Sequence, residues 1–566
     1  MKQLIECVPN FSEGRNLSII KQITDEIEKC EGVKLLDVDP GFSTNRTVVT
    51  FVGAPNDVVA AAKAAICKAK ELIDMRQHHG DHPRFGATDV CPLVPVANIT
   101  MEETAEYARK LAKEVGEELG IPVYCYENAA YTEVRRNLAN CRSGEYEGLR
   151  DKLANPNWKP DFGPAEFTEE VAKSGASAIG ARDFLIAVNY NLNTTSTRRA
   201  NAIAFDVREK GRPKREGNPI TGKIVKDANG EPVMLPGTLK GTKAIGWYIK
   251  EYGVAQVSMN ITNTSLTPLH VAFEEVCAKA AARGIRVTGA EIVGLVPKKT
   301  LIDAGRFYLA KQHRSLGVDE NEMIKIAVKS MGLDDLKPFN PEEKVIEYLI
   351  EKDEKKDRLI DMTCEGFVNE TASESPAPGG GSISAYMGAL GAALGTMVAN
   401  LSSHKPGWDD RWEEFSVIAE KGQALKEELL HLVDEDTNAF NRIMAAFGLP
   451  KKSEEEKAAR HAAIQEATKY AIEVPYKTVC ASFQVFDICK AMIEKGNPNS
   501  VTDAGVGVLC AKAAVTGAFL NVKINASSLD DKNYSDNIVK QAAGFVTKAN
   551  ELEKSLLEQV NAVIEK

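Results

Sequence analysis

Residues 33–73 read VKLLDVDPGFSTNRTVVTFVGAPNDVVAAAKAAICKAKELI, and this stretch decides the fold of the first part of the chain. Its apolar runs at 33–38 and 47–52 favour two strands, and the apolar spacing over 58–73 favours a helix. The same alternation continues on both sides. Further strands are expected at 4–8, 90–96, 122–126, 184–189, 255–260 and 285–296, and further helices at 17–29, 104–119, 198–210 and 269–282. The pattern predicts two successive α+β units of about 150 residues each.

Two segments interrupt this alternation. Residues 155–182 are rich in Pro, Gly, Ser and Ala, so we expect a loop or connector there. Residues 211–237 carry Gly, Pro and Asn around a short alternating centre, Lys223-Ile224-Val225. That composition is typical of a hairpin inserted between two elements.

The character of the chain changes after residue 333. The charge run EKDEKKDR at 351–358 marks a boundary. Ser453 and Glu456 form a capping box, and Gly496 is a helix stop. Long helical patterns follow the boundary at 384–401, 410–447, 453–474, 476–495, 501–522 and 535–565. They predict a separate all-α bundle.

The charge and cysteine content of the chain exclude some classes of function. The 566 residues contain 70 Lys+Arg and 80 Asp+Glu, a formal charge of −10. An acidic chain gains nothing from the counterion release that drives nucleic-acid binding, so no nucleic-acid partner is expected. Eleven cysteines are scattered without a C-x-x-C motif, and the N-terminus lacks the apolar stretch of a signal peptide. Both features favour a cytoplasmic protein with reduced thiols.

One segment approaches the length of a membrane span, because residues 375–403 contain no charge. Its content is mostly Gly, Ala and Ser, which is weakly hydrophobic. A buried, tightly packed helix explains it better, so we expect no membrane partner.

The densest polar cluster is RQHHGDHPR at 76–84, where three of the eight histidines lie within five positions. Histidine and aspartate are common metal ligands, but Gly80 and Pro83 break any helix that would align His78 with His82. We therefore expect no metal. A loop histidine close to guanidinium groups suits acid–base chemistry, and Arg84 is a candidate carboxylate ligand.

Polar loops follow two of the predicted strands. Asn10 belongs to the first loop, and Asn45 and Arg46 belong to the second. Loops at strand ends often form ligand sites, although ordinary turn chemistry explains these residues equally well.

A glycine-rich loop, SPAPGGGS, precedes the first long helix of the bundle. Gly379, Gly380, Gly381 and Ser382 would let backbone N–H groups approach an anion. No Walker lysine follows, which weighs against a nucleotide. Asp503 lies among small residues at a later helix start, where an acidic residue more often anchors the first turn than acts in catalysis.

Asp436 is the sharpest candidate in the bundle. At about 100° per residue it lies within about 40° of the apolar stripe formed by Leu425, Leu429, Leu432, Phe440 and Ile443. Asp434 falls on the far side of the same helix. A carboxylate on a buried face is unfavourable unless it is hydrogen-bonded or used, and burial would raise its pKa into the range of proton transfer. A structural role, capping a neighbouring helix, is the alternative.

The motifs CVPNFSEGRN, LLDVDPGFSTNRTVVTFVG, HHGDHPRFGATDVCPLVPV, DFGP and IGWY resemble glutamate formimidoyltransferase over residues 1–330. From Phe367 onward, SPAPGGGSISA and DEDTNAF resemble formimidoyltetrahydrofolate cyclodeaminase. The order matches the bifunctional formimidoyltransferase-cyclodeaminase family of histidine breakdown. Residues 211–235 form a longer stretch than the resemblance to the animal enzymes predicts.

The resemblance implies two reactions. The formimidoyl group of N-formimidoyl-L-glutamate moves to N5 of tetrahydrofolate, and then N10 closes the ring to 5,10-methenyltetrahydrofolate as ammonia leaves. It implies His82 as the acid–base group of the first step and Asp436 as that of the second. It also implies that folate contacts two segments: Gly163, Pro164, Ala165, Glu166, Phe167, Thr168, Glu169, Glu170, Val171 and Ala172, and Gly237, Thr238, Leu239, Lys240, Gly241, Thr242, Lys243, Ala244, Ile245 and Gly246.

The resulting expectations concern fold, domains and partners. The fold is two ferredoxin-like α+β subdomains, at 1–180 and 181–330, then a linker at 331–358 and a cyclodeaminase helical domain at 359–566. Tetrahydrofolate, as a polyglutamate, is the co-substrate, and the protein is a cytoplasmic homo-oligomer. Two alternatives stay open for the helical domain: a methenyltetrahydrofolate cyclohydrolase, or an oligomerisation module without activity.

Overall fold

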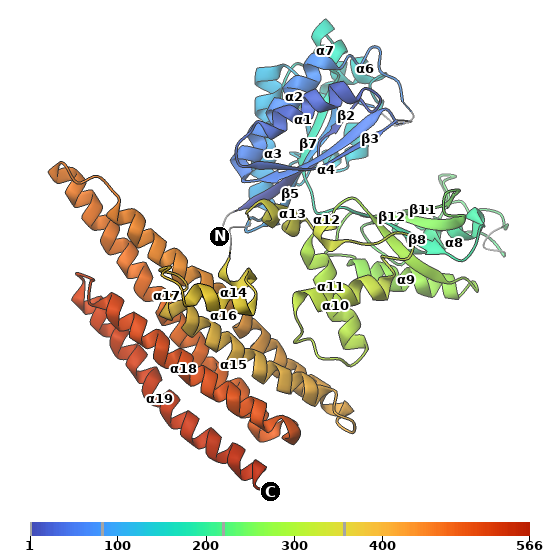
Figure 1. Cartoon of the computed structure of the whole chain (residues 1–566). Helices are drawn as coiled ribbons and strands as arrows, with labels where there is room; N and C mark the ends of the chain where they lie inside the picture. Colours follow the sequence, from blue (N-terminus) through green and yellow to red (C-terminus); the bar gives the residue numbers. More distant parts are fainter. Residues whose placement is uncertain (1–2, 43, 81–83, 218–220, 355–357) are drawn as a thin grey trace. The chain divides into compact units, whose positions relative to one another are not determined.

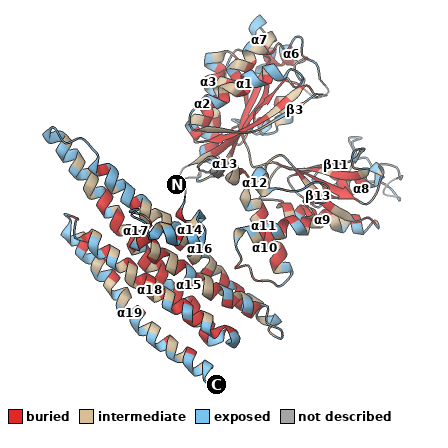
Figure 2. Ribbon diagram, viewed as in Figure 1, coloured by how far each residue is buried: buried red, intermediate tan, exposed pale blue. Residues whose placement is uncertain are grey.

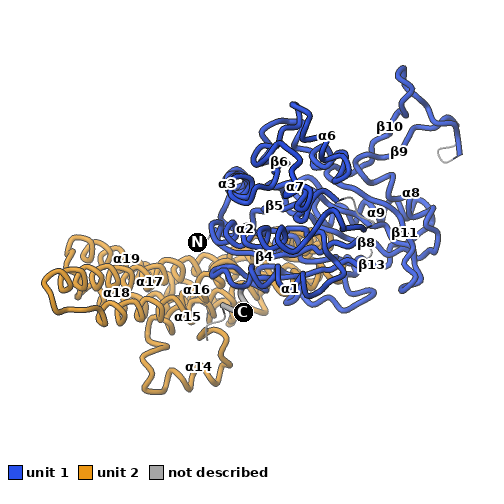
Figure 3. Tube along the Cα trace, turned by 90° about the horizontal axis from the view of Figure 1, so that it is seen from above, with its two compact units in different colours: residues 1–300, 331–353 blue, residues 301–330, 354–566 orange. Residues whose placement is uncertain are grey.

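The computed structural model describes residues 3–42, 44–80, 84–217, 221–354 and 358–566. It divides into two compact units (Figure 3): residues 1–300 with 331–353, and residues 301–330 with 354–566. The first unit contains the strands and the second is helical (Figure 1). An α+β part followed by a helical part is confirmed. The predicted limits of the subdomains and of the linker stay predictions.

The first half of unit 1 is a seven-stranded mixed sheet with the order β1-β4-β2-β5-β7-β6, in which β3 pairs with β4 and β1 also pairs with β5. Three long helices pack on it around a shared apolar core. The strands are β1 (Leu4–Cys7), β2 (Asn10–Phe11), β3 (Val33–Gly41), β4 (Arg46–Gly53), β5 (Thr88–Ala97), β6 (Val123–Glu127) and β7 (Ser177–Ala181). The helices are α1 (Leu17–Glu28), α2 (Pro55–Leu72), α3 (Met101–Leu119), α4 (Glu133–Arg136), α5 (Leu138–Cys141), α6 (Leu149–Ala154) and α7 (Glu169–Ser174).

The expectation of a plain connector at 155–182 was wrong, because this segment contains α7 and the fully buried strand β7. β7 pairs in parallel with both β5 and β6. Its sequence is SAIGA, and Gly180 lies against Tyr126: a Cβ at Gly180 would lie 2.5 Å from the Tyr126 carbonyl oxygen. Small residues that looked like loop composition are therefore packing residues of an interior strand.

The second half of unit 1 is a four-stranded antiparallel sheet with the order β11-β12-β8-β13. Its elements are β8 (Ile186–Leu192), α8 (Thr197–Val207), β11 (Thr242–Ile249), β12 (Val254–Ile261), α9 (Leu269–Ala281) and β13 (Val287–Val293), and α12 (Pro341–Lys344) and α13 (Ile346–Glu354) also belong to unit 1. β11 was not predicted as a strand. The predicted hairpin insertion is confirmed, because β9 (Arg212–Pro213) pairs antiparallel with β10 (Met234–Leu235).

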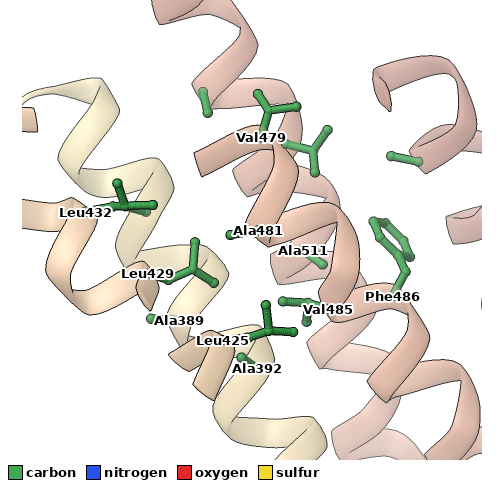
Figure 4. Close-up of a cluster of buried hydrophobic side chains, with 14 of the residues drawn as sticks. Ala389, Ala392, Leu425, Leu429, Leu432, Val479, Ala481, Val485, Phe486 and Ala511 are labelled. Atoms are coloured by element: carbon green, nitrogen blue, oxygen red, sulfur yellow. The ribbon is translucent and has the colours of Figure 1, made fainter. Parts of the chain in front are cut away.

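Unit 2 is a helical bundle. Its long helices are α15 (Gly380–Ser403), α16 (Trp412–Phe447), α17 (Glu454–Lys495), α18 (Val501–Ala526) and α19 (Lys532–Ile564), accompanied by α14 (Cys364–Thr371) and by most of α10 (Lys298–Lys311) and α11 (Glu320–Met331). Figure 4 shows the core, where Ala389 and Ala392 of α15 face the leucines of α16 and Val485 of α17. The predicted capping box of Ser453 and Glu456 and the helix end at Gly496 are confirmed.

The expected break between helices at residue 475 was wrong, since α17 continues through Pro475. Proline cannot donate to the carbonyl four residues earlier, which usually disrupts a helix. Here Asn525 Nδ2 donates to that carbonyl, Ala471 O, at 2.6 Å. A side chain of α18 thus replaces the missing hydrogen bond, and packing against α16 and α18 keeps the helix continuous.

Two helices, Gly380–Ser403 and Pro498–Ala526, are long and apolar enough to cross a membrane by length and composition. In the most apolar window of the first, 61% of the residues are buried inside the bundle, and in the second 44%. Core helices of bundles share these properties, and Figure 2 shows buried residues along both.

Candidate active sites

The first candidate site lies where the N-terminus of α15 meets the middle of α16. Ser382 N donates to Asp436 Oδ2 at 2.9 Å, and Ser382 Oγ lies 3.2 Å from the same oxygen. A Cβ at Gly381 would lie 2.1 Å from Asp436 Oδ1. The glycine loop and the aspartate, singled out separately in the sequence, therefore form one site. Glycine is needed here because the carboxylate occupies the space of a side chain.

Burial raises the pKa of Asp436 above its ordinary value, and the two hydrogen bonds from Ser382 oppose that rise without cancelling it. A carboxyl group with a raised pKa keeps its proton to a higher pH than an exposed aspartate does, and it can pass that proton to a substrate atom. This environment is suited to a proton donor.

The predicted apolar face of α16 is confirmed in part. Leu425, Leu429 and Leu432 are buried, whereas Phe440 is 38% exposed. The reason is that fewer residues pack against the C-terminal end of α16, so that residues 440–449 are mostly exposed to solvent. Asp436 lies at this transition and is half-buried, which leaves it reachable by a small molecule.

Asp434, which its helical phase places away from the apolar stripe, is half-buried. Its Oδ1 accepts a hydrogen bond from Leu359 N at 2.7 Å, and burial raises its pKa as well. The preceding segment, 359–361, covers this side of α16. Asp434 therefore caps a backbone group.

The other glycines of the loop and Asp503 lie near the same helices without a described bond to Asp436. A Cβ at Gly380 would lie 3.4 Å from Asn521 Nδ2, and one at Gly379 3.7 Å from Pro376 O. Asp503 lies in the first turn of α18 and is half-exposed. Its position agrees with an anchor of that helix turn.

The second candidate site lies on the sheet of unit 1. Arg46 donates from Nε and Nη2 to Asn10 Oδ1, at 2.9 and 2.6 Å, and forms an ion pair with Asp89 through Nη1. Arg142 Nη2 lies 2.9 Å from the same Asp89 oxygen, Oδ2. The Asp89 side chain is only 1% exposed. Two of the predicted residues, Asn10 and Arg46, are thus brought together around a carboxylate that the sequence analysis missed.

The sequence does contain a feature that points to Asp89. It is a charged residue within the otherwise apolar strand TDVCPLVPVA of β5, and such a residue requires a buried partner. Nothing in the sequence pointed to Arg142, which lies more than fifty residues later.

Asn45 joins three loops. It has φ of 48°, accepts a hydrogen bond from Gly14 N at 3.0 Å, and donates from Nδ2 to His79 O at 3.0 Å. His78 Nε2 lies 2.8 Å from Asn45 O, and burial lowers the pKa of His78. Because a carbonyl only accepts, Nε2 carries a proton, and the lowered pKa favours the neutral ring, in which Nδ1 is unprotonated. Among the described residues nothing bonds to this buried Nδ1.

Arg84 is held within the protein. Its guanidinium donates to Met75 O at 2.9 Å and to His78 O, pairs with Glu147, and lies 5.1 Å from the Tyr146 ring centroid. These contacts tie Arg84 to residues 75–78 and to residues 146–147. His82 lies outside the described residues.

The two predicted folate segments have different structures. In the first, Thr168 caps α7 by accepting from Val171 N, and Gly163 has φ of +85° beside Ile121 O. The second, residues 237–246, follows α8: Thr238 N donates to Asp206 O at 3.0 Å, and Gly246 N donates to Asn201 Oδ1 at 2.9 Å.

The buried cluster around Asp89 supports a stability prediction. We expect Asp89→Asn to lower the free energy of unfolding by about 3 kcal/mol or more, because two largely buried guanidiniums, those of Arg46 and Arg142, lose a buried charged partner. Urea denaturation followed by the near-ultraviolet signal of unit 1 measures this. The exposed carboxylate Glu145 is the control, and Glu145→Gln should change stability by less than about 0.5 kcal/mol. Equal stability of the Asp89 variant would contradict the structural role.

Comparison with known proteins covers the whole chain. Family models match in three segments: formiminotransferase domain, N-terminal subdomain, at 4–182; formiminotransferase domain at 187–351; and formiminotransferase-cyclodeaminase at 363–544. Formimidoyltransferase-cyclodeaminase of Gallus gallus is 42% identical over 567 residues, which is 100% of this chain and 99% of that protein. Glutamate formimidoyltransferase of Thermoplasma acidophilum is 42% identical over 324 residues, covering 57% of this chain and 96% of its own.

A third relative matches the helical part alone. Methenyltetrahydrofolate cyclohydrolase of Methylorubrum extorquens is 40% identical over 202 residues, 36% of this chain and 97% of that protein. This match covers 36% of the chain, whereas the similarity to the Gallus gallus protein covers all of it. The chain belongs to the formimidoyltransferase-cyclodeaminase family.

Proposed function

We propose that this protein catalyses two successive reactions on one folate. The first transfers the formimidoyl group of N-formimidoyl-L-glutamate to N5 of tetrahydrofolate and releases glutamate. The second closes the ring to 5,10-methenyltetrahydrofolate and releases ammonia. The reactions belong to histidine degradation and one-carbon metabolism. The observation that carries the proposal is the pairing of Asp436 with the glycine loop, together with family membership over the full chain.

In the second reaction Asp436 supplies the proton. N10 of the folate attacks the amidine carbon, and the proton that N10 loses passes to the imino nitrogen, which gives a tetrahedral intermediate bearing an amino group. The protonated carboxyl of Asp436 gives its proton to that amino group, the C–N bond breaks, and ammonia leaves. The raised pKa favours the protonated donor, and the hydrogen bonds from Ser382 stabilise the carboxylate that remains.

In the first reaction His82 is the acid–base group. It accepts the proton that N5 loses on attacking the formimidoyl carbon, and then protonates the departing glutamate nitrogen. Support comes from the family motif at 78–84 and from the anchoring of the flanking residues, since Asn45, Met75 and Glu147 fix both sides of this loop.

A second candidate function for the helical domain is a methenyltetrahydrofolate cyclohydrolase, because a protein of that name is 40% identical to it. A cyclohydrolase adds water to the methenyl compound, whereas a cyclodeaminase forms that compound and releases ammonia. Purified protein given 5-formimidoyltetrahydrofolate tests the two. One ammonia per folate with stable methenyl product supports the deaminase. Loss of added methenyltetrahydrofolate without ammonia would support the cyclohydrolase and overturn the second reaction.

The contact between Gly381 and Asp436 gives a test of the site. In Gly381→Ala the added methyl group would displace the carboxylate, whose Oδ1 lies 2.1 Å from the methyl position. We expect ring closure to slow by about 10²-fold, since a misplaced catalytic group loses much of its effect. Formimidoyl transfer should not change. In the control, Gly544→Ala in α19, the new methyl meets nothing within 4 Å. Unchanged ring closure in Gly381→Ala would contradict the role of Asp436.

A homo-oligomer is also part of the proposal. α15 and α18 both pack on α17, and each leaves apolar side chains exposed: Leu390, Met397 and Leu401 on the first, and Val506, Leu509, Leu520 and Ile524 on the second. Large exposed apolar surfaces usually mark interfaces. A light-scattering mass equal to the 61.6 kDa of one chain would contradict it.

We also propose a ferredoxin-like fold for unit 1 and a cytoplasmic location for the protein. Both halves of unit 1 are ferredoxin-like, supported by the β-α-β-β-α-β succession and by the strand orders β3-β4-β1-β5 and β11-β12-β8-β13. A cytoplasmic location is supported by eleven free cysteines and is tested by cell fractionation. Tetrahydrofolate polyglutamate is the proposed co-substrate.

A further inference from the structure

A cavity of about 490 Å³ lies beside α8, and arginines dominate its lining. Arg198 and Arg199 come from the first turn of α8, Arg212 and Arg215 from the hairpin insertion, and Arg283 from the end of α9. All belong to the second half of unit 1, where the β9–β10 hairpin follows α8 (Figure 3). None of these five residues belongs to the sites described above.

The guanidiniums are only partly neutralised. Asp206 pairs with both Arg212 and Arg283, and Arg215 Nη1 donates to Gly222 O at 2.7 Å. Arg198 and Arg199 are exposed and have no ion pair among the described residues. Among the described residues, Asp206 is thus the one carboxylate that pairs with any of the five arginines, and it pairs with two of them. Burial, with the nearby charge of Arg212, also lowers the pKa of Arg208, the residue that follows α8.

The cavity adjoins the second predicted folate segment. Asn201 lines the cavity and holds Gly246 from both sides: its Oδ1 accepts from Gly246 N at 2.9 Å, and its Nδ2 donates to Gly246 O at 3.0 Å. At the other end of α8, Leu239 N donates to Val207 O at 2.9 Å. The segment 237–246 therefore runs along α8. An extended tail of a ligand bound at this segment would reach the arginines within the length of α8.

We propose that this arginine-lined cavity binds an anion that carries several carboxylate or phosphate groups. Planar guanidinium groups match both kinds of oxygen pair, and several cations with one internal carboxylate favour a multivalent ligand. Two sources share this chemistry. One is the γ-linked glutamate tail of the folate substrate, which rests on the proposed function. The other is a free polyphosphate, such as that of a nucleotide.

The test uses the full-length protein with the double substitution Arg198→Gln and Arg199→Gln. Both side chains are exposed, so the fold should be retained. The matched control is Lys214→Gln with Lys223→Gln, which removes two exposed charges from the same hairpin region outside the cavity. Transferase KM is measured with tetrahydrofolate mono- and pentaglutamate, and binding of tripolyphosphate is measured by titration calorimetry at fixed low salt.

If the tail is the ligand, the arginine variant raises KM for the pentaglutamate about tenfold, with kcat and the monoglutamate KM unchanged and the control unaffected. If a free polyphosphate is the ligand, the wild type binds tripolyphosphate, the arginine variant binds it about tenfold more weakly, and the pentaglutamate KM stays constant. Either result supports the cavity as an anion site. Equal KM ratios and equal tripolyphosphate binding in wild type, variant and control would overturn it. A wild type that lacks transferase activity yet binds tripolyphosphate would overturn the proposed function and leave this site standing.

Discussion

In Asp436→Asn, we expect ring closure to fall by about 10²–10⁴-fold while formimidoyl transfer keeps its wild-type rate. The amide retains the shape and the hydrogen bonds from Ser382, but it has no acidic proton for the departing amino group. 5-Formimidoyltetrahydrofolate should therefore accumulate. Separate assays of released glutamate and released ammonia measure the two steps.

The matched control is Asp434→Asn, two residues earlier on α16. Asp434 accepts a hydrogen bond from Leu359 N, and an asparagine oxygen can accept it as well. We expect ring closure within about twofold of wild type, since this carboxyl does not face the glycine loop. Equal losses in both variants would mean that the helix, and not the proton of Asp436, is what the reaction needs.

The raised pKa of Asp436 also sets the sign of a stability effect. The folded state holds this proton more tightly than the unfolded state, where the value is 3.8. The carboxyl therefore favours folding below the unfolded pKa, and that contribution is lost as the pH rises through the raised folded value. Asparagine does not ionise, so Asp436→Asn should melt at a higher temperature than wild type at about pH 8, with the gap shrinking toward about pH 4.

In His82→Ala, we expect formimidoyl transfer to fall by about 10²–10⁴-fold, because both proton transfers of the first step lose their acid–base group. Ring closure should keep its rate when 5-formimidoyltetrahydrofolate is supplied directly. The measurement is glutamate release from N-formimidoyl-L-glutamate, followed in the presence of tetrahydrofolate.

The control for this loop is His79→Ala. The His79 side chain is exposed, and among the described residues the only hydrogen bond to His79 is the one that its backbone carbonyl accepts from Asn45 Nδ2. Transfer should stay within about twofold of wild type. Full transfer in His82→Ala would refute the assignment, and the unprotonated Nδ1 of His78 would then become the group to replace.

Much of the fold could be predicted because local patterns decided it. The strands β1, β3, β4 and β5 and the long bundle helices follow from apolar spacing and caps, and the structure moves their ends by only a few residues. Failures came where a distant residue overrides the local signal. In β7, Gly180 leaves room for Tyr126, and Pro475 stays helical because Asn525 bonds to Ala471 O.

The candidate site was predictable to a similar degree. Helical phase identified Asp436, and glycine composition identified the loop, but only the structure joins Gly381 to Asp436 across 55 positions. The cluster of Arg46, Asn10 and Asp89 shows the same limit, since a charged residue in a strand signals a partner without saying which. Contacts between remote segments depend on the fold, which spacing alone does not specify.

The two reactions are tested most directly by adding N-formimidoyl-L-glutamate and tetrahydrofolate together to the purified protein and following three products with time. We expect glutamate, ammonia and methenyltetrahydrofolate to rise in a ratio of about one to one to one, and the ultraviolet absorbance of the methenyl product to persist. Glutamate release without ammonia or methenyl product would contradict the second reaction, and no glutamate release would contradict the first.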